Sequence, residues 1–391
     1  MNRRPTALLA QELGMGLWHA RLLAAVARAL RARGFRCVFA LADPVLARAA
    51  LRPEDAVVPA PVYVPAGAVV PAGVRTKSFA DILGACGWSQ ASVVGALMAS
   101  WDALIGLVGP DVVVADHAPT LLLAARGRAP RVSVGLGFTT PPAGLPSFPD
   151  LHDGPPGTFG EAAVKAAVNR ALGARGAGPL ARLPQALEAD ATFVTVMADL
   201  DPYQGARTTP ALGPVGAPRA PAAAAPTEEG VFAYLAAEDP RTEPTLTWLA
   251  GRGPVRAFVR RADAATRARL EAAGVTVRAR PADLAVELGR ADVVVHHGGA
   301  GLTQQAALAG RAQLLLPRHL EQQWNAQVVA RQGAGRVAVA PGEAALSEAL
   351  DALRQPRVAQ LARAWAEIAG AQLTPDPAGV IAERCAALTR R

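Results

Sequence analysis

The sequence predicts an α/β protein built from two Rossmann-like, doubly wound parallel-sheet domains that face each other across a cleft. Three observations lead to this prediction. The chain has 391 residues, a length that suggests two or three domains. Short apolar runs typical of buried strands alternate with helical segments in both halves. A stretch rich in proline and alanine, within residues 216–229, separates the two halves and is predicted to be a linker.

The amino-terminal half begins as strand, glycine-bearing loop, helix and strand. Apolar residues from Leu22 to Leu30 share one face at helical spacing, and Gly34 is placed to end this helix. The expected strands are residues 6–10, 35–40, 111–116 and 131–135, and the first helix is residues 20–33. Strands that alternate with helices in this way indicate a parallel sheet.

Residues 82–101 contain no charged side chain, and their length alone would allow a membrane span. Three glycines and several polar residues interrupt the segment, so its apolar character is modest. We therefore expect a pair of buried helices that is broken near Gly87 and Trp88.

The alternation restarts after the linker. The expected strands are residues 231–235, 255–259, 275–279, 292–296 and 313–316, and the expected helices are residues 262–273, 281–288, 302–309 and 321–331. The predicted domains are residues 1–215, an acceptor-binding domain, and residues 230–375, a nucleotide-sugar domain. A last helix, residues 376–391, is positioned to pack back on the first domain. Ligands of such sheets lie beyond the carboxyl ends of the strands.

The charge of the chain argues against nucleic-acid binding. The formal net charge is +8, but only Lys77 and Lys165 of the 40 basic residues are lysines, and the arginines are dispersed. Aromatic residues make up only 5%, which leaves no stacking platform for bases. Solvated helix faces explain the charge, although acidic substrates or peripheral contact with an anionic membrane remain compatible with it.

Cysteine use and the amino terminus predict a cytoplasmic protein. The three cysteines, Cys37, Cys86 and Cys385, are widely spaced, which excludes a disulfide framework or a cysteine-rich zinc site and fits a reducing compartment. The apolar run before Glu12 is too short for a signal peptide.

Residues 293–303 form the most informative passage of the chain. An apolar strand runs through His297 into a glycine turn and then into a helix N-terminus, a geometry that presents backbone N–H groups and a positive dipole end to a diphosphate. Glu321 and Gln322 follow the next strand, where a carboxylate and an amide suit sugar hydroxyls. His297 considered alone is better explained as a turn histidine.

Two motifs together are far more specific. The His-Gly-Gly-x-Gly turn at residues 297–301 is followed by Pro-(x)3-Glu-Gln-(x)2-Asn-Ala from Pro317. This combination resembles the donor-binding signature of GT-B glycosyltransferases of the nucleotide-sugar-dependent family 1 type. The resemblance implies a nucleoside-diphosphate sugar as co-substrate, with no metal or other cofactor. It assigns the diphosphate to His297, Gly298, Gly299, Gly301 and Thr303, and the sugar and ribose to Gln305, Glu321 and Gln322.

The chain departs from the family pattern at three places. Gln305 stands where a glutamate usually grips the ribose, Leu302 where a serine or threonine is expected, and Arg280 near a position that often holds an aromatic residue. These differences leave two alternatives open. One is a GT-B homologue that binds ligand without turnover, and the other is a GT-B sugar-nucleotide epimerase.

His19 and Asp116 are the candidate catalytic pair. His19 closely follows the first strand and Asp116 ends the apolar run that begins at Val112, so both lie at carboxyl ends of predicted parallel strands. In the resembled family the corresponding histidine is the general base, and a carboxylate orients it. From the residues alone, a loop histidine, a helix N-cap aspartate and the neighbouring His117 are competing explanations.

The resemblance as a whole predicts an inverting, metal-independent glycosyltransferase that acts on a hydroxyl of an apolar small-molecule or lipid acceptor. Trp18 and Phe138 are candidate acceptor contacts.

Asp199 and Asp201 have the Asp-x-Asp spacing of metal-dependent enzymes of a different fold, and we interpret them as part of a turn. His152 and Asp153 lie in a proline-rich loop with no second ligand cluster.

Overall fold

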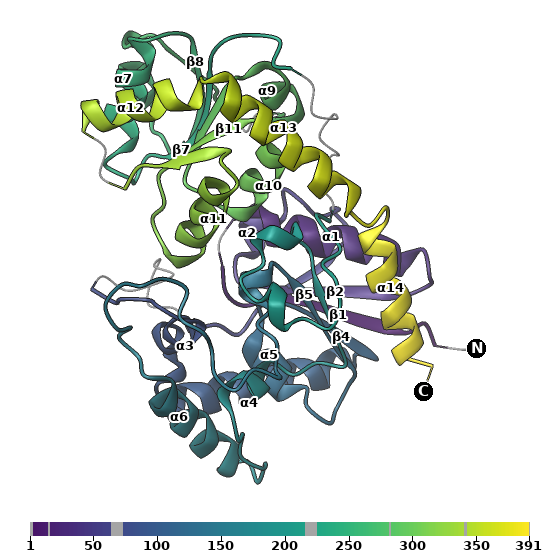
Figure 1. Ribbon diagram of the computed structural model, residues 1–391. Coiled ribbons are helices and arrows are strands. Elements are labelled where there is room, and N and C mark those ends of the chain that lie inside the picture. The colour runs from purple at the N-terminus through teal and green to yellow at the C-terminus, as the bar shows by residue number, and fades with distance from the viewer. Residues whose placement is uncertain are drawn as a thin grey trace. The chain divides into compact units, whose positions relative to one another are not determined.

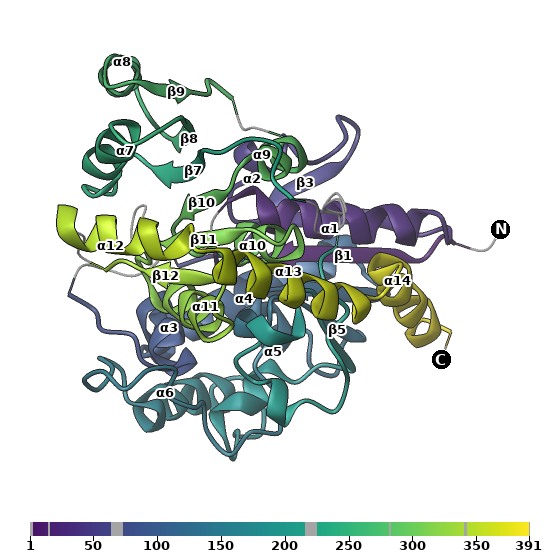
Figure 2. The same cartoon turned by 45° about the horizontal axis from the view of Figure 1, so that its top comes forward.

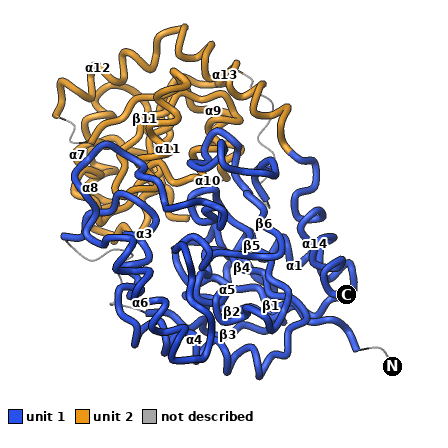
Figure 3. The backbone as a smooth tube through the Cα atoms, turned by 60° about the horizontal axis from the view of Figure 1, so that its bottom comes forward, with its two compact units in different colours: residues 1–216, 374–391 blue, residues 217–373 orange. Residues whose placement is uncertain are grey.

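The computed structural model describes residues 3–14, 16–63, 73–215, 225–280, 283–339 and 342–390. Its contacts divide the chain into two compact units (Figure 3). Unit 1 comprises residues 1–216 and 374–391, and unit 2 comprises residues 217–373. Residues 216–224 of the predicted linker lie outside the described residues, as do Pro281 and Ala282.

Unit 1 contains a six-stranded parallel sheet in the order β3-β2-β1-β4-β5-β6. Its strands are β1 (Thr6–Gln11), β2 (Arg36–Leu41), β3 (Ala56–Pro59), β4 (Val112–Asp116), β5 (Arg131–Gly135) and β6 (Ala191–Val194). Its α-helices are α1 (Leu17–Arg31), α2 (Pro44–Ala47), α3 (Phe79–Leu83), α4 (Ala91–Val108), α5 (Pro119–Ala124), α6 (Glu161–Gly173) and α14 (Pro377–Leu388). Shorter helical turns are η1 (Gly84–Trp88), η2 (Gly137–Thr139), η3 (Leu183–Leu187), η4 (Ala198–Leu200) and η5 (Gln204–Ala206).

Unit 2 contains a second six-stranded parallel sheet, in the order β12-β11-β10-β7-β8-β9. Its strands are β7 (Val231–Ala236), β8 (Val255–Arg260), β9 (Val275–Val277), β10 (Val293–His296), β11 (Ala312–Leu315) and β12 (Gly335–Val337). Its helices are α7 (Thr242–Ala250), α8 (Ala264–Ala272), α9 (Leu284–Arg290), α10 (Ala300–Leu308), α11 (Leu320–Arg331), α12 (Glu343–Leu353) and α13 (Pro356–Ala371). The predicted α/β class, with two Rossmann-like sheets, is confirmed.

Each sheet has one point where the strand order reverses direction. In unit 1 this point lies between β1 and β4, and in unit 2 it lies between β7 and β10. The connections on either side of such a pair run to opposite faces, which leaves the carboxyl ends of the two central strands accessible to a ligand. Gln11 pairs in register with Asp116 in unit 1, and Tyr234 pairs with His296 in unit 2.

The core of unit 1 joins the two ends of its sequence. In Figures 1 and 2, α14 lies beside α1, and α4, α5 and α6 group together. Ile381 and Cys385 of α14 are fully buried among the apolar side chains of α1 and of the inward faces of β1, β2 and β4. The carboxy-terminal helix therefore completes the core of unit 1.

Both faces of the unit 2 sheet are apolar, as the continuous hydrophobic strands require. Val231, Ala233 and Leu235 of β7 pack on one face with α7, α8 and α12. Phe232 lies on the opposite face together with Leu288 of α9 and Leu302 of α10.

The segment 82–101 forms separate helices, as predicted, but the expectation that both are buried is wrong for α4, in which only Val94, Met98, Trp101 and Ile105 are buried. Cys86 and Gly87 leave helical geometry, and Gly87 has φ 89° with Val93 and Tyr63 so close that a β-carbon would not fit. Among the described residues, one helix, Ala91–Val108, is long and apolar enough to cross a membrane by length and composition. Helix α4 packs against α5 and α6, and a single helix of this kind is weak evidence for a membrane span.

The helices whose bounds were expected begin one to three residues from the expected positions, and two of these differences have a local cause. Helix α1 starts at Leu17 because Gly16, with φ 97°, supplies the N-cap geometry, so Trp18 and His19 lie in its first turn. Helix α9 starts at Leu284 because the side chain of Asp283 accepts the N–H of Ala285. The interpretation of residues 199–201 as part of a turn is confirmed by the short helix η4.

We expect the substitution Ile381→Ala to destabilise unit 1. Ile381 is fully buried between α14 and the core, and removal of such a side chain costs about 2–5 kcal/mol of the free energy of unfolding. Chemical denaturation of the full chain measures the loss. Val380→Ala on the same helix is the matched control, because Val380 is 37% exposed and should change stability by less than about 0.5 kcal/mol. Equal effects of the two changes would contradict the packing of α14.

Candidate functional site

The two candidate catalytic residues are in contact in unit 1. Nδ1 of His19 and Oδ2 of Asp116 are 2.8 Å apart, and both side chains are buried. His19 comes from the first turn of α1 and Asp116 from the last position of β4, so the pair lies at the point where the sheet reverses direction. An aspartate at this distance accepts the Nδ1–H of histidine, which leaves Nε2 as the nitrogen that carries the lone pair.

Two glycines make room for this pair. A β-carbon on Gly14 would lie 2.3 Å from Nε2 of His19, and Gly14 has φ 88°, a conformation that glycine adopts without strain. A β-carbon on Gly135 would lie 2.9 Å from Oδ1 of Asp116. The side-chain amide of Gln11 donates to the carbonyl oxygens of Leu13 and Gly14 and so fixes the loop.

Glu12 is a buried carboxyl group beside this loop that sequence reasoning missed. Its Oε1 accepts the N–H of Leu121 (2.6 Å) and its Oε2 the N–H of Thr120 (3.1 Å), at the beginning of α5. Burial raises the pKa of Glu12 to about 7, against the lowering effect of these hydrogen bonds. The signal in the sequence was a glutamate directly after a buried strand.

The aromatic side chains of unit 1 form a group of their own. Phe79 contacts Phe138 and Phe148 edge-on, with ring centroids 6.1 Å and 5.3 Å apart, and lies 5.9 Å from the ring of His117. Phe138 is therefore part of a buried aromatic group next to the candidate pair His19 and Asp116. Trp18 is half-buried in the first turn of α1, and its indole N–H has no partner among the described residues.

The other sequence candidates in unit 1 have structural partners. Arg207 donates to both carboxylate oxygens of Asp201 and to the carbonyl oxygens of Gly137 and Thr140, which holds the turn that carries Phe138. Nδ1 of His152 accepts the N–H of Gly154 within its loop. Within the described parts of the chain, no group of three or more His, Cys, Asp or Glu side chains could hold a metal ion.

In unit 2, two adjacent histidines build the turn after β10. Nδ1 of His296 accepts the N–H of Gly298 (3.0 Å), and its other nitrogen lies 2.9 Å from Oε1 of Gln313. Nε2 of His297 accepts the N–H of Ala236 (3.1 Å), and its Nδ1 lies 3.0 Å from the carbonyl oxygen of Leu316. His297 thus bridges the ends of β7 and β11.

One nitrogen of each histidine ring accepts a backbone N–H, which requires a neutral imidazole. Burial lowers the pKa of His296 to about 4 and also lowers the pKa of His297, although Asp239 lies 3.6 Å from Nδ1 of His297. Asp239 is held by Arg241, whose guanidinium also donates to the carbonyl oxygens of Leu316 and Pro317. Neither Asp239 nor Arg241 was singled out from the sequence, and their place directly after β7 was the available signal.

The glycine turn and the block that starts at Pro317 interlock. Gly298 has φ 87°, and a β-carbon there would lie 2.8 Å from the carbonyl oxygen of Gln322. The amide of Asn325 donates to the carbonyl oxygen of Gly298 (2.9 Å). The spacing of the two sequence motifs therefore reflects direct contact between the turn and α11.

The remaining donor candidates lie on α10 and α11. The hydroxyl of Thr303 is inside α10, where it donates to the carbonyl oxygen of Gly299, while Gln305 is half-buried one turn further on. Glu321 and Gln322 are half-buried in the first turn of α11, and Oε1 of Gln322 accepts the N–H of Arg318. Gly299 is the N-cap of α10, and the first intrahelical bond is donated by the N–H of Thr303, so the preceding N–H groups, including those of Gly301 and Leu302, point out of the helix end.

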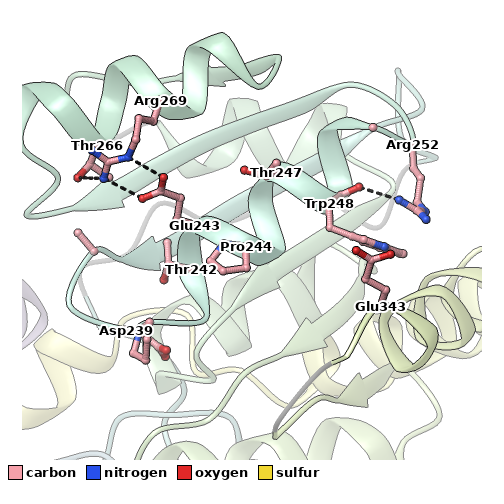
Figure 4. Close-up of a pocket in the computed structure, with 13 residues that line it drawn as sticks. Asp239, Thr242, Glu243, Pro244, Thr247, Trp248, Arg252, Thr266, Arg269 and Glu343 are labelled. Carbon is pink, nitrogen blue, oxygen red and sulfur yellow. Dashed lines mark hydrogen bonds and ion pairs between the residues drawn. The ribbon is translucent and has the colours of Figure 1, made fainter.

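A separate cavity of about 800 Å³ opens in unit 2 between α7, α8 and the start of α12 (Figure 4). Two of its charged side chains, the arginines, have partners within the cavity: Arg269 holds Glu243, and the guanidinium of Arg252 lies 3.8 Å from the ring centre of Trp248. Asp239 is part of its lining, but the glycine turn and α11 are not. The cavity is therefore distinct from the candidate donor residues.

Comparison with known proteins bears on both units. Residues 257–388 match the family described as erythromycin biosynthesis protein CIII-like, C-terminal domain. Two solved structures match along nearly the whole chain. The calicheamicin glycosyltransferase CalG4 has a TM-score of 0.70 at 19% identity and is matched over 100% of this chain and 99% of its own. The glycosyltransferase VinC, solved in complex with dTDP, has a TM-score of 0.65 at 17% identity over 98% and 100%. The chain has the GT-B fold.

Curated relatives match over shorter segments. The chain is 38% identical over 99 residues to the elloramycin glycosyltransferase ElmGT of Streptomyces olivaceus, which is 25% of each chain. It is 50% identical over 50 residues to the vancomycin aglycone glucosyltransferase of Amycolatopsis orientalis, which is 13% of this chain and 12% of that protein. The chain thus aligns with a quarter or less of the length of these relatives. The fold and the family resemblance predicted from the sequence are confirmed.

We expect the stability of the protein to fall as pH rises through the range in which Glu12 ionises. The folded pKa of about 7 lies above the ordinary value of 4.5, so the folded state holds this proton more tightly and loses that advantage between about pH 4.5 and pH 7. A shift of this size corresponds to about 3 kcal/mol. Glu12→Gln cannot ionise, so the difference in unfolding free energy between wild type and variant should move in favour of the variant from pH 5 to pH 8. A constant difference across this range would contradict the raised pKa.

Proposed function

We propose that the protein is an inverting, metal-independent glycosyltransferase that transfers a sugar from a nucleoside-diphosphate sugar to a hydroxyl of an apolar acceptor. The observation that carries this proposal is the buried contact of 2.8 Å between His19 and Asp116 at the reversal point of the unit 1 sheet. A histidine oriented by a buried carboxylate is suited to accept a proton at neutral pH.

In the proposed reaction, Nε2 of His19 takes the proton of the acceptor hydroxyl as its oxygen attacks the anomeric carbon. The new bond between this carbon and the acceptor oxygen forms as the bond to the diphosphate oxygen breaks, with inversion at the anomeric carbon. The proton resides on His19 as an imidazolium, which the carboxylate of Asp116 stabilises. The nucleoside diphosphate leaves with the electron pair.

The diphosphate would be held at the amino-terminal end of α10 by His297, Gly298, Gly299 and Gly301. The outward N–H groups and the positive end of the helix dipole meet its negative charge, and this charge is greatest as the sugar departs. Thr303 supports the helix end from inside through its bond to Gly299. His297 would donate to a phosphate oxygen only after giving up its present bond from Ala236, so the backbone groups make the first contact.

Sugar and ribose contacts are proposed for Glu321, Gln322 and Gln305. Glu321 and Gln322 are half-buried in the first turn of α11, and Gln305 is half-buried within α10. Leu302, where a hydroxyl residue is usual, packs into the apolar group of Phe232 and Leu288, and its backbone N–H still belongs to the helix end. This departure removes a hydroxyl but keeps the N–H, which supports retention of donor binding.

A homologue that binds a nucleotide without turnover is the second candidate, and Gln305 favours it. An amide grips a ribose diol less strongly than a charged carboxylate. Acceptors of the small-molecule antibiotic type fit the proposal because the buried aromatic group of Phe79, Phe138 and Phe148 lies close to His117 and the catalytic pair.

We expect His19→Ala to lose transfer activity by about 10²–10⁴-fold in kcat, since it removes the base, while donor affinity stays at the wild-type level. The measurement is a mass-spectrometric panel of UDP-, dTDP- and GDP-sugars with mixed apolar acceptors. Asp116→Asn is the second variant and should lower kcat because an amide does not stabilise the imidazolium. Full transfer by His19→Ala would overturn the mechanism, and wild-type binding of a nucleotide without any product would favour the second candidate.

We expect Asn325→Ala to weaken donor binding by about tenfold. The change removes the hydrogen bond that fixes the carbonyl oxygen of Gly298 and thereby loosens the turn. Isothermal titration with UDP and dTDP measures the dissociation constant. Gln323→Ala on the same helix is the control, because its half-buried side chain is not part of the turn. Equal nucleotide affinity in wild type and Asn325→Ala would contradict the role of this contact.

A further inference from the structure

His117 has a backbone conformation that its residue type rarely adopts. It follows Asp116 directly and has φ 47°, one of only two positive values among the described residues other than glycine. Such a conformation costs about 1 kcal/mol for a residue with a β-carbon and persists only where the surroundings enforce it. The carbonyl oxygen of His117 accepts the N–H of Leu13 (3.0 Å), which ties this strained position to the loop that carries Gly14.

The ring of His117 is buried without hydrogen bonds. The residue is 6% exposed, and neither Nδ1 nor Nε2 has a partner among the described residues. Burial of a polar group without a partner is unfavourable, so proteins normally satisfy it or replace it by an apolar side chain. A histidine that serves only packing would be expected to have at least one such partner. His152, His296 and His297 each have one.

The surroundings of His117 are polar on one side and aromatic on the other. Its ring centroid is 6.3 Å from that of His19 and 5.9 Å from that of Phe79. Burial, and then the neighbouring His19, lower the pKa of His117 to about 3, so the ring is neutral at physiological pH. A neutral imidazole has one N–H donor and one nitrogen acceptor and can bond either a hydroxyl or a carbonyl oxygen.

A polar atom of the preceding residue shares this property. Oδ1 of Asp116, at the end of β4, is also buried without a partner among the described residues. Asp116 and His117 therefore present unsatisfied polar atoms at one sheet edge, next to the proposed base. Such a concentration is typical of a site that binds polar groups of a ligand.

We propose that His117 is a specificity-determining residue, which hydrogen-bonds a second oxygen of the acceptor next to the hydroxyl that His19 deprotonates. The acceptor class is then a flat, apolar molecule with two neighbouring oxygen substituents, whose hydrocarbon body contacts the aromatic group of Phe79. This inference rests on the proposed function and adds to it the chemistry of the acceptor. His117 takes no proton in the reaction.

The test compares two acceptors that differ by one oxygen, 2,3-dihydroxynaphthalene and 2-naphthol. In the wild type, kcat/KM should favour the dihydroxy compound by about tenfold, well beyond the twofold advantage of its two equivalent hydroxyls, because a buried polar group discriminates against a ligand that leaves it unpaired. His117→Phe keeps the size and aromatic packing and lacks both nitrogens. In this variant the preference, read as the ratio of kcat/KM for the two acceptors, should fall to about twofold.

Two further variants separate recognition from packing. His117→Asn restores a donor and an acceptor and tolerates positive φ, so it should recover part of the preference. Phe148→Leu alters the aromatic group and leaves both nitrogens of His117 in place. It should lower kcat/KM for the two acceptors by the same factor. The melting temperature of His117→Phe should equal or exceed that of the wild type, since no satisfied hydrogen bond is lost. A preference that survives in His117→Phe, or a variant that melts several degrees lower, would overturn the proposal.

The role of His117 can also be tested by binding alone, if the protein shows no catalytic turnover. Isothermal titration of the full chain with the same two naphthols measures the preference as a ratio of dissociation constants, in wild type and His117→Phe. If no donor gives a product but this ratio collapses in the variant, the proposed transferase function fails and the assignment of His117 stands. If products form but the ratio of dissociation constants is the same in wild type and in His117→Phe, only the assignment of His117 fails.

Discussion

The placement of every candidate functional residue depends on one constraint, which is that all strands of each sheet run parallel. Parallel strands end at a common edge, and the connections that leave the central pair of strands go to opposite faces. In unit 1 this brings together side chains that are 97 residues apart in the sequence, His19 and Asp116. In unit 2 the same geometry brings the end of β7 to the turn at His297. A strand order other than the observed one would separate both pairs.

The two units differ in the side chains that lie at the carboxyl ends of their strands. The edge of unit 1 contains side chains that are costly to bury, including a carboxyl group with a raised pKa, Glu12, and the unsatisfied ring of His117. The edge of unit 2 is internally satisfied, because His296, His297 and Asn325 all bond to the turn or to strand ends. Unit 2 therefore offers a preorganised backbone surface, while unit 1 holds reactive and polar side chains in an aromatic setting. This difference matches the division of labour proposed for donor and acceptor.

Glycine has a specific physical role at three of these positions. Gly14 and Gly135 leave the space that His19 and Asp116 occupy, and Gly298 allows the turn to approach α11. A β-carbon at Gly135 or Gly298 would collide with a residue that is distant in the sequence, Asp116 or Gln322, and one at Gly14 would collide with the ring of His19. The requirement for glycine therefore comes from tertiary contact as well as from backbone conformation, and it explains why the glycine turn and the Pro317 block occur together.

The sequence by itself determined the fold class and the two parallel sheets, because hydrophobic periodicity is a local property, and it contains the two motifs that carry the family resemblance. It also predicted the pairing of His19 with Asp116, since both follow strands expected to be parallel. Only the tertiary structure decided that Glu12 caps α5, that Asp239 and Arg241 brace His297, and that Asn325 holds Gly298. The unsatisfied ring of His117 was likewise beyond sequence reasoning. Whether a buried polar atom has a partner depends on distances between segments far apart in the chain, and no local pattern of residues records those distances.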